Sequence, residues 1–438
     1  MNDTAVAAFL AAPLDERQAR RLGDLGLRAD LVTDEDRAAS DGWIEAVSRG
    51  FLGTERSEVQ RQAAFDGLRA RRRLGVYDDS APVPGTPVAT FASWLAELTV
   101  PGPALIDTAA ISSVTVAPTH RRRGLARAMM EGELRAAASA GVPVATLTVS
   151  ESTLYGRYGF APAAEAAHWR IEAKRAGWIG PVSPGRVDFV PRVDARALIE
   201  PLYDRVRLAR PGEITMPAGH WDRFLRTRPD SEKGEELRTV VYTTVAGEVT
   251  GVALYSVTES HDDFARSTLE LVYLLALDDE SYAGLWRFFL EMDLIGWIEA
   301  PELSVDEPLL WMIADQRAAQ RTVRDHHYVR ILDVVAALEA RRYSGAGRVV
   351  IEIADPLGFA AGRVLLDVDE RGVGSVRHAD ETTDAPSLRL GIAELSAAYL
   401  GGVRLATLAA AGRVTGDGVA AASALFAAPQ APMLSFWY

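Results

Sequence analysis

The sequence predicts an α/β protein of several domains, in which strands and helices alternate before a separate α+β region. Its 438 residues suffice for two or three domains. Residues 88–149 have the order strand, helix, strand, and their last strand is short and almost wholly apolar, as in a parallel sheet. Strands followed by a helix return at 239–292, so the middle region echoes the first.

Composition excludes several classes of function. The net charge of −13 argues against nucleic-acid binding, although acidity also simply favours solubility. The sequence lacks an apolar run of membrane-spanning length and a signal-peptide pattern, so we expect a cytoplasmic protein without a membrane partner. With no cysteine, disulfides, thiolate metal sites and a cysteine nucleophile are excluded. The histidines are scattered, apart from adjacent His326 and His327, so we expect no metal.

Turn signals and periodicity predict three domains, at 1–172 (with a helical extension at 1–28), 173–325 and 326–438. In the first we expect strands at 88–95, 109–116 and 144–149, a loop at 75–87, helices at 5–27 and 125–140, and a helical stretch at 44–73 with a turn around Gly53. In the second, a Gly- and Pro-rich bridge at 173–191 precedes a helix at 195–207, strands at 239–246, 250–257 and 269–277, and a helix at 282–292. In the third we expect helices near 334–341, 393 and 405, and hairpins near 355–358 and 372.

The segment 114–130 is the most informative part of the chain. A strand ends, a loop containing Arg121-x-x-Gly124-x-Ala126 follows, and a helix begins. The first turn of a helix has free backbone N–H groups and a positive dipole end, which bind phosphate. Gly124 and Ala126 allow a close approach to the backbone. Four arginines supply charge for phosphate oxygens: Arg121, Arg122, Arg123 and Arg127.

Two better-known phosphate-binding loops fit this segment poorly. A P-loop would need Gly-Lys-Ser or Gly-Lys-Thr, and a Rossmann cradle would need a second early glycine; the segment has neither. A basic loop that merely caps a helix remains an alternative. For His120, within the loop, we expect a structural hydrogen bond.

The segment resembles the pyrophosphate loop of the GCN5-related N-acetyltransferases. The resemblance implies an acetyl-CoA site between two parallel strands that pair at 111–116 and 144–149 and then splay apart. It implies cofactor contacts from Val114, Thr115, Val116, Arg121, Arg122, Arg123, Gly124, Leu125, Ala126, Arg127, Ser150 and Glu151. Ser150 could equally be the cap of a following helix.

The motif Tyr155-Gly-Arg-Tyr158-Gly-Phe160 has the form that usually ends the cofactor core of this fold. Transfer from a thioester creates a thiolate, and a nearby phenol can protonate it as a general acid. We assign this role to Tyr155, with packing as its alternative function and Tyr158 as a competing phenol.

A longer set of motifs resembles the enhanced intracellular survival (Eis) family of aminoglycoside and lysine acetyltransferases. It comprises Val116 to Leu125, Ser150-Glu151, Tyr155 to Phe160, Trp221-Asp-Arg-Phe-Leu, Pro308-Leu-Leu, Leu332 to Arg341 and Tyr399 to Arg413. The resemblance implies tandem acetyltransferase-like domains with mixed sheets, a C-terminal sterol-carrier-like α+β domain and hexameric assembly. It also implies that the terminal carboxylate of Tyr438 is the catalytic base. The aromatic end Ser435-Phe-Trp-Tyr fits a docked terminus.

Two departures from the family pattern concern the acceptor pocket: Trp437 replaces a frequent acid, and Ser113 replaces a frequent aromatic residue. Asp41 and Trp43 lie in the region expected to line that pocket, and Trp43 is as readily a core residue. Acids at 278–280 in the middle domain predict that it binds no CoA.

Three functions follow as hypotheses. The first is acetyl transfer to a primary amine, such as a polyamine, an aminoglycoside or a lysine side chain. The second is a non-catalytic acyl-CoA sensor or scaffold. The third, suggested by resemblance alone, is lipid carriage by the last domain.

Overall fold

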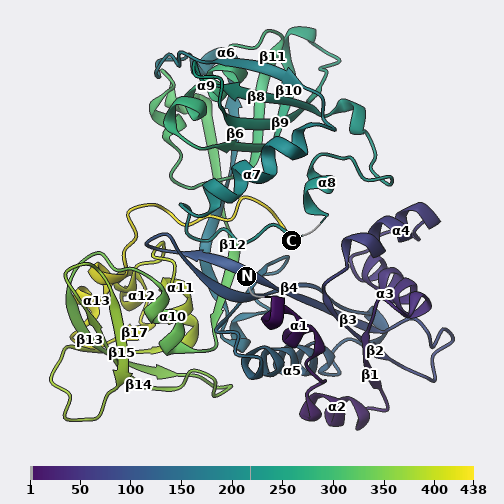
Figure 1. The fold of residues 1–438 in the computed structure, drawn as a ribbon, viewed down its shortest axis with the longest axis vertical. Coiled ribbons are helices and arrows are strands. Elements are labelled where there is room, and N and C mark those ends of the chain that lie inside the picture. Colours follow the sequence, from purple (N-terminus) through teal and green to yellow (C-terminus); the bar gives the residue numbers. More distant parts are fainter. Residues whose placement is uncertain (1–2, 218) are drawn as a thin grey trace. The chain divides into compact units, whose positions relative to one another are not determined.

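The computed structural model describes residues 3–217 and 219–438, which form two compact units (Figure 1). The first unit holds the chain up to Ala164 together with 327–429 and Tyr438. The second holds 165–326 and 430–437. Strands β6 (Ala161–Glu172) and β12 (Ala319–Ile331) each contain a boundary between the units.

The N-terminal sheet of the first unit has the order β1-β2-β3-β4-β5-β12. Its β4–β5 pair is parallel and its other neighbours are antiparallel. The strands are β1 (Arg28–Val32), β2 (Arg72–Tyr77), β3 (Ala89–Val100), β4 (Ala104–Val116), β5 (Val144–Thr148) and residues 327–331 of β12. The parallel pair is joined through α5 (Leu125–Ser139), as the sequence predicts for 125–140.

Both faces of this sheet are covered, which explains why β3 is buried along nearly all its length. Alternate residues of a strand point to opposite faces. Phe91 belongs to a core cluster with Leu125 and Met129 of α5, whereas Ala92 belongs to a second cluster with Trp43. Helices α3 (Arg37–Gly50) and α4 (Glu58–Gly67) supply that second cluster, and two N-terminal helices join the first.

The N-terminal extension forms two helices, α1 (Asp3–Ala11) and α2 (Glu16–Gly23), rather than the single helix expected at 5–27. Pro13 cannot donate a backbone hydrogen bond, and the Asp15 carboxylate caps α2 by accepting from Gln18 N at 2.8 Å. Helix α2 packs closely on α5, because a Cβ added at Gly132 would clash with Gln18 Oε1. The extension is therefore part of the first unit's core.

Buried Arg72 anchors the connection between α1 and α2. Its guanidinium donates to both carboxylate oxygens of Glu133 (2.8 and 3.3 Å) and to the carbonyls of Ala12 and Pro13. Removal of one partner from such a buried pair costs roughly 3–5 kcal/mol of stability. These bonds therefore hold the connection before α2 against Glu133 of α5.

The C-terminal part of the first unit is an α+β domain. Its sheet has the order β15-β14-β13-β16-β17, in which β13 and β16 are parallel and the other pairs antiparallel. Its strands are β13 (Gly347–Ala354), β14 (Gly362–Val368), β15 (Gly374–His378), β16 (Ser387–Gly391) and β17 (Val414–Thr415). Its helices are α10 (Val334–Ala340), α11 (Ile392–Ala398), α12 (Leu405–Ala410) and α13 (Val419–Phe426). The expected hairpins and helices are thus present.

The second unit contains a sheet of order β6-β11-β10-β9-β8-β7, in which only β10 and β11 are parallel. Its strands besides β6 are β7 (Arg186–Val190), β8 (Arg238–Thr243), β9 (Val249–Thr258), β10 (Ser267–Ala276) and β11 (Ile295–Leu303). Its helices are α6 (Ala173–Ala176), α7 (Ala195–Arg207), α8 (His220–Phe224) and α9 (Asp279–Leu290). The order β10, α9, β11 repeats the order β4, α5, β5 of the first unit, as the sequence suggests.

Two sequence expectations need correction. The segment 173–191 is not a free bridge, because it contributes α6 and β7, and β7 pairs with β8. The expected loop at 75–87 begins only at Asp78, since residues up to Tyr77 pair with β1 and β3.

Candidate active site

Strands β4 and β5 separate where a thioester cofactor would enter. They pair from Thr108↔Val144 to Ile111↔Leu147 and no further. The sequence predicted pairing of β5 with residues 111–116, but the observed pairing ends at Ile111, the first residue of that range. Ser113 has a left-handed φ of +54°, and the register with β3 shifts at this point, which is typical of a β-bulge. The β4 backbone at 114–116 consequently has no β5 partner.

A threonine pair stabilises this bulge. The hydroxyl of Thr90 lies 2.8 Å from the Ser113 carbonyl oxygen and 2.7 Å from the Thr115 hydroxyl. Thr90 and Thr115 are buried. The splayed conformation is thus built into the core.

The first turn of α5 has free amide groups. Gly124 precedes the helix with φ +84° and provides no side-chain cap, and Arg122 also has a positive φ of +61°. Left-handed residues that alternate with ordinary ones before a helix make a concave array of N–H groups that binds anions. Leu125 packs in the core and Ala126 has only a methyl side chain, so neither blocks that array.

The four arginines of the loop divide into two pairs. Arg121 and Arg122 are exposed, and neither makes a hydrogen bond or ion pair with the described residues. Arg123 donates to the Leu25 carbonyl at 3.1 Å, and Arg127 bonds Glu131 at 2.5 Å. Only the first pair is therefore free to meet a phosphate without rearrangement.

Sequence reasoning missed Arg21 of α2, which lies beside this loop. Its Nη2 would be 3.1 Å from a Cβ on Gly124, and its Nη1 is 3.9 Å from Glu131. The run Arg17, Arg20, Arg21 was visible in the sequence, but the packing of α2 on α5 was not. The N-terminal extension thus adds a cation at the start of α5.

Tyr155 begins a short 3-10 turn at Gly156–Tyr158, and its ring packs edge-on against Phe160 at 6.2 Å. Its hydroxyl makes no hydrogen bond with the described residues. Burial, with smaller contributions from Tyr158 and Glu151, raises the pKa of Tyr155 above its usual value of 10. The phenol therefore keeps its proton at neutral pH and can donate it.

Tyr158 is more deeply buried than Tyr155, and its backbone carbonyl accepts from Arg330 Nε at 2.7 Å. Burial raises the pKa of Tyr158 as well, Arg157 opposes this most, Glu131 reinforces it, and Arg127 and Arg21 oppose it further. The charges of Arg127 and Arg21, near the start of α5, therefore affect the pKa of the Tyr158 hydroxyl.

The chain ends at the carboxyl end of β5. The terminal carbonyl oxygen of Tyr438 accepts from the Thr148 hydroxyl at 2.7 Å. The ring is 7% exposed, packs edge-on against Trp94 at 5.1 Å, and has its hydroxyl 3.0 Å from His327 Nε2. Burial raises the pKa of the Tyr438 phenol, so the phenol stays protonated at neutral pH.

The expected acceptor residues differ in their surroundings. Asp41 is paired with Arg37 at 2.8 Å, and Trp43 is 1% exposed with its Nε1 donating to the Leu74 carbonyl at 2.8 Å. The burial of Trp43 is what the core alternative predicts. Ser113 lies in the bulge, and Trp437 stacks on His326 at 5.4 Å within the second unit.

Ser150 and Glu151 follow β5 and are exposed. Ser150 caps no helix, because the next helical turn begins after Tyr155. His120 makes the structural hydrogen bond favoured by the sequence: its Nε2 lies 3.0 Å from Asp78 Oδ2. The Ser80 hydroxyl and His120 hold the pKa of Asp78 at about 2, so this carboxylate remains charged. The bond ties the phosphate loop to the β2–β3 connection.

Over residues 3–217 and 219–438, no group of three His, Cys, Asp or Glu side chains could hold a metal ion. The helices in these same ranges are all too short or too polar to cross a membrane.

Family models match three segments. Residues 33–163 and 212–331 each match an acetyltransferase (GNAT) domain, and residues 334–435 match a sterol carrier protein domain.

Curated relatives match over most of their length. An uncharacterized N-acetyltransferase of Streptomyces avermitilis is 36% identical over 395 residues, or 88% of this chain and 92% of the relative. The N-acetyltransferase Eis of Mycobacterium tuberculosis is 33% identical over 344 residues, or 76% and 80%. Eis1 of Mycobacterium abscessus is a solved structure with TM-score 0.80 and 28% identity, covering 94% of this chain and all of its own. A GCN5-related N-acetyltransferase of Anabaena variabilis shares the fold, with TM-score 0.79 at 18% identity over 94% and all of the two chains.

Proposed function

Because this chain belongs to the Eis family of GCN5-related N-acetyltransferases, we propose that it transfers an acetyl group from acetyl-CoA directly to a primary amine. Tyr155 is the general acid, and the terminal carboxylate of Tyr438 is the base. The acceptors are polyamines, lysine side chains or aminoglycosides. The observation that carries the proposal is the docked chain terminus, whose carbonyl oxygen accepts from Thr148 at the end of β5 at 2.7 Å. Tyr155 follows the same strand in the sequence and offers a protonated phenol.

The uncapped first turn of α5 supports binding of acetyl-CoA. Its backbone amides would hold the diphosphate, and Arg121 and Arg122 would neutralise its charge. The unpaired β4 backbone at 114–116 would bond the pantetheine arm. These groups orient the thioester toward the end of β5.

The base acts on the incoming amine. A primary ammonium ion must lose a proton before its nitrogen can attack the thioester carbonyl carbon, and a carboxylate accepts that proton directly or through water. The Thr148 hydroxyl fixes the terminal group at the edge where β4 and β5 separate. Burial of the aromatic ring holds the last residue against fraying.

The acid acts on the leaving group. When the new C–N bond has formed, the C–S bond breaks and its electron pair goes to sulfur. The phenol of Tyr155 protonates that thiolate, which yields free CoA and an amide. The raised pKa of Tyr155 keeps this proton available throughout the neutral range.

The test is CoA release from acetyl-CoA with a panel of spermidine, a lysine peptide and kanamycin. We expect turnover with at least one amine, and a loss of about 100-fold in kcat for Tyr155→Phe. Wild-type kcat should not fall on the alkaline side until above pH 10, because the pKa of Tyr155 is raised. A glycine-serine pair appended after Tyr438 should reduce kcat comparably.

Tyr158→Phe is the matched control for the acid. A larger loss of kcat in Tyr158→Phe than in Tyr155→Phe would show that Tyr158, not Tyr155, is the general acid. Tight binding of CoA with no turnover for any amine would instead favour the sensor function suggested by Ser113 and Trp437.

A further inference from the structure

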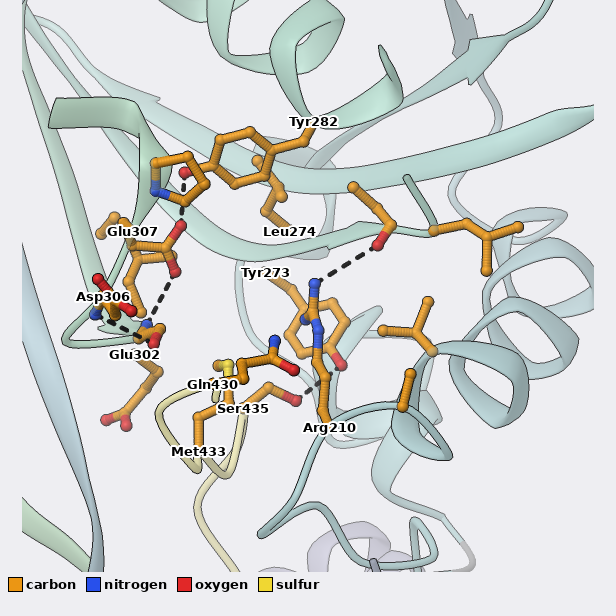
Figure 2. Close-up of a pocket in the computed structure, with 18 of the residues that line it drawn as sticks. Arg210, Tyr273, Leu274, Tyr282, Glu302, Asp306, Glu307, Gln430, Met433 and Ser435 are labelled. Atoms are coloured by element: carbon orange, nitrogen blue, oxygen red, sulfur yellow. Dashed lines mark hydrogen bonds between the residues drawn. The ribbon is translucent and has the colours of Figure 1, made fainter. Parts of the chain in front are cut away.

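The second unit contains a cavity of about 290 Å³ at the position that corresponds to the splayed strands of the first unit (Figure 2). Strands β10 and β11 pair in parallel only from Ser267↔Ile295 to Glu270↔Glu299. Beyond that point, residues 271–279 and 300–308 line opposite sides of the cavity, and α7 and the tail at 430–435 complete it. The parallel pair β10–β11 of the second unit thus separates after a short paired stretch, as the pair β4–β5 does in the first unit.

This second gap cannot hold a diphosphate in the same way. The Asp278 carboxylate caps α9 by accepting from Ser281 N at 2.8 Å and from its hydroxyl at 2.7 Å. Asp279 and Glu280 add negative charge to the first turn of α9. The helix amide is already occupied and like charges repel a phosphate, so the cavity requires another ligand.

Arg210 provides the recognition group. Its side chain extends into the cavity and donates one long bond of 3.4 Å to the Ala276 carbonyl (Figure 2). Its guanidinium has five N–H donors, and none is ion-paired to a carboxylate of the described residues. The geometry of a guanidinium matches a carboxylate through two parallel bonds.

The neighbouring acids are already engaged. Glu213 accepts from the Tyr203 hydroxyl at 3.0 Å and from Ser435 N at 3.2 Å. Glu307 accepts from the Tyr282 hydroxyl and from Ser304 N at 2.9 Å. Burial raises the pKa of both carboxyls. The positive charge of Arg210 opposes this rise for both carboxyls, but neither carboxylate lies within ion-pair distance of it. The N–H donors of Arg210 therefore remain available to an anion from outside.

The rest of the lining limits the size and character of the ligand. Apolar walls come from Val206, Leu271, Leu303 and Met433. At the rim, the exposed carboxylates of Asp279 and Asp306 make no ion pair in the described parts of the chain. A short carboxylic acid fits the interior, and an amino group at its far end would meet the rim.

The tail forms one wall of the cavity. Met433 N bonds the Pro211 carbonyl at 2.9 Å, and the Ser435 hydroxyl lies 3.0 Å from that of Tyr273. Ser435 is three residues from Tyr438, so a ligand that contacts this wall touches the segment leading to the chain terminus.

We propose that this cavity is an effector site for a small organic carboxylate held by Arg210, and that its occupancy orders the tail at 430–437. The regulatory part rests on the proposed role of the terminal carboxylate, whereas the binding part does not. The ligand is either a simple short-chain acid or an amino acid, and in both cases its carboxylate is the group that binds Arg210.

The test is calorimetry on the full chain without CoA, using butyrate, 6-aminohexanoate and pentylamine. We expect both carboxylates to bind, 6-aminohexanoate more tightly, and pentylamine not to bind. Arg210→Gln should weaken binding at least tenfold, and Arg210→Lys should weaken it less. Arg205→Gln is the matched control, because Arg205 also lines the cavity but is paired with Glu248 at 2.9 Å.

Absence of heat with both carboxylates would refute the proposal, as would unchanged binding in Arg210→Gln with an unaltered melting curve. Stronger binding of pentylamine than of the acids would also refute it. For the regulatory part, 6-aminohexanoate should slow amide hydrogen exchange across 430–437 in the wild type and not in Arg210→Gln. Unchanged exchange with binding intact would overturn that part alone, and neither readout depends on acetyl transfer.

Discussion

The hydroxyl of Thr148 donates a 2.7 Å hydrogen bond to the terminal carbonyl oxygen of Tyr438, which attaches the end of the chain to the end of β5. A chain terminus ordinarily frays, and this one is held by the Thr148 bond, by the contact of its hydroxyl with His327 Nε2 at 3.0 Å and by burial of its aromatic ring. The bond reaches the group proposed as base, so it controls where the proton is accepted.

Thr148→Val should therefore reduce kcat about fivefold with little change in the KM for acetyl-CoA, because about 1 kcal/mol of positioning energy is lost. Thr108→Val is the matched control. It removes a 3.2 Å bond to Thr146, whose side chain also hydrogen-bonds the Tyr438 phenol, and should lower stability with a smaller loss of kcat than Thr148→Val. Equal kcat losses in both variants would show that the effect is general to the strand pair.

Arg21→Ala should raise the KM for acetyl-CoA about three- to tenfold and leave kcat unchanged, because one cation near the diphosphate is lost. Arg20→Ala is the control, since Arg20 is exposed and paired with Glu16 at 3.2 Å. The Arg21 effect should shrink with added salt. An unchanged KM for acetyl-CoA in Arg21→Ala would show that Arg21 contributes to packing and not to cofactor binding.

Acetyl-CoA should bind with a stoichiometry of one per chain. The first turn of α5 is uncapped, whereas that of α9 is capped by Asp278. Equilibrium dialysis of the wild type would report the number of sites. Two sites per chain would mean that acids at the start of α9 do not exclude phosphate.

The stability of the second unit should fall as the pH decreases below 6.5. Burial lowers the pKa of His326, against an opposing contribution from Glu302. Between the lowered pKa and 6.5 the unfolded chain binds the proton and the folded chain does not, so acid favours unfolding. Its Nε2 lies 3.1 Å from the Phe436 carbonyl, and this hydrogen bond favours the protonated ring, so it opposes the effect of burial without cancelling it.

Thermal melts between pH 7.5 and 5.5 would measure this dependence, with His326→Gln as the comparison. The variant should be less stable at pH 7.5 but should show a weaker loss toward pH 5.5. A steeper loss in the variant would contradict the assignment.

Local signals in the sequence predicted the strand–loop–helix structure of residues 114–127 well. Strand, loop, glycine and helix are contiguous from Val114 to Arg127, so their geometry depends on short-range rules. Helix α7 likewise matches its predicted bounds, because its apolar periodicity is uninterrupted. The break between α1 and α2 was missed, although Pro13 and the capping Asp15 were visible.

Such local signals could not predict which residues far apart in the sequence lie next to each other in the fold. Arg21 reaches the loop only because α2 packs on α5 through Gly132, across more than 100 residues of sequence. Trp43 could be assigned to pocket or core only once its bond to the Leu74 carbonyl was known. The strand register, which shifts the paired region to Thr108–Ile111, depends on the bulge at Ser113.

Arg330 lies at the end of β12, and its fully buried guanidinium donates two 2.8 Å bonds to Asp355 and one of 2.7 Å to the Tyr158 carbonyl. Asp355 belongs to the sterol-carrier-like region, whereas Tyr158 ends the turn that begins at Tyr155. The sterol-carrier-like region therefore supplies the counter-ion for a charge on β12, a strand of the N-terminal sheet. A shortened gene that ends after β12 would encode a protein with that charge stranded in its core, which makes the terminal region an unsuitable place to trim the enzyme for crystallisation or engineering.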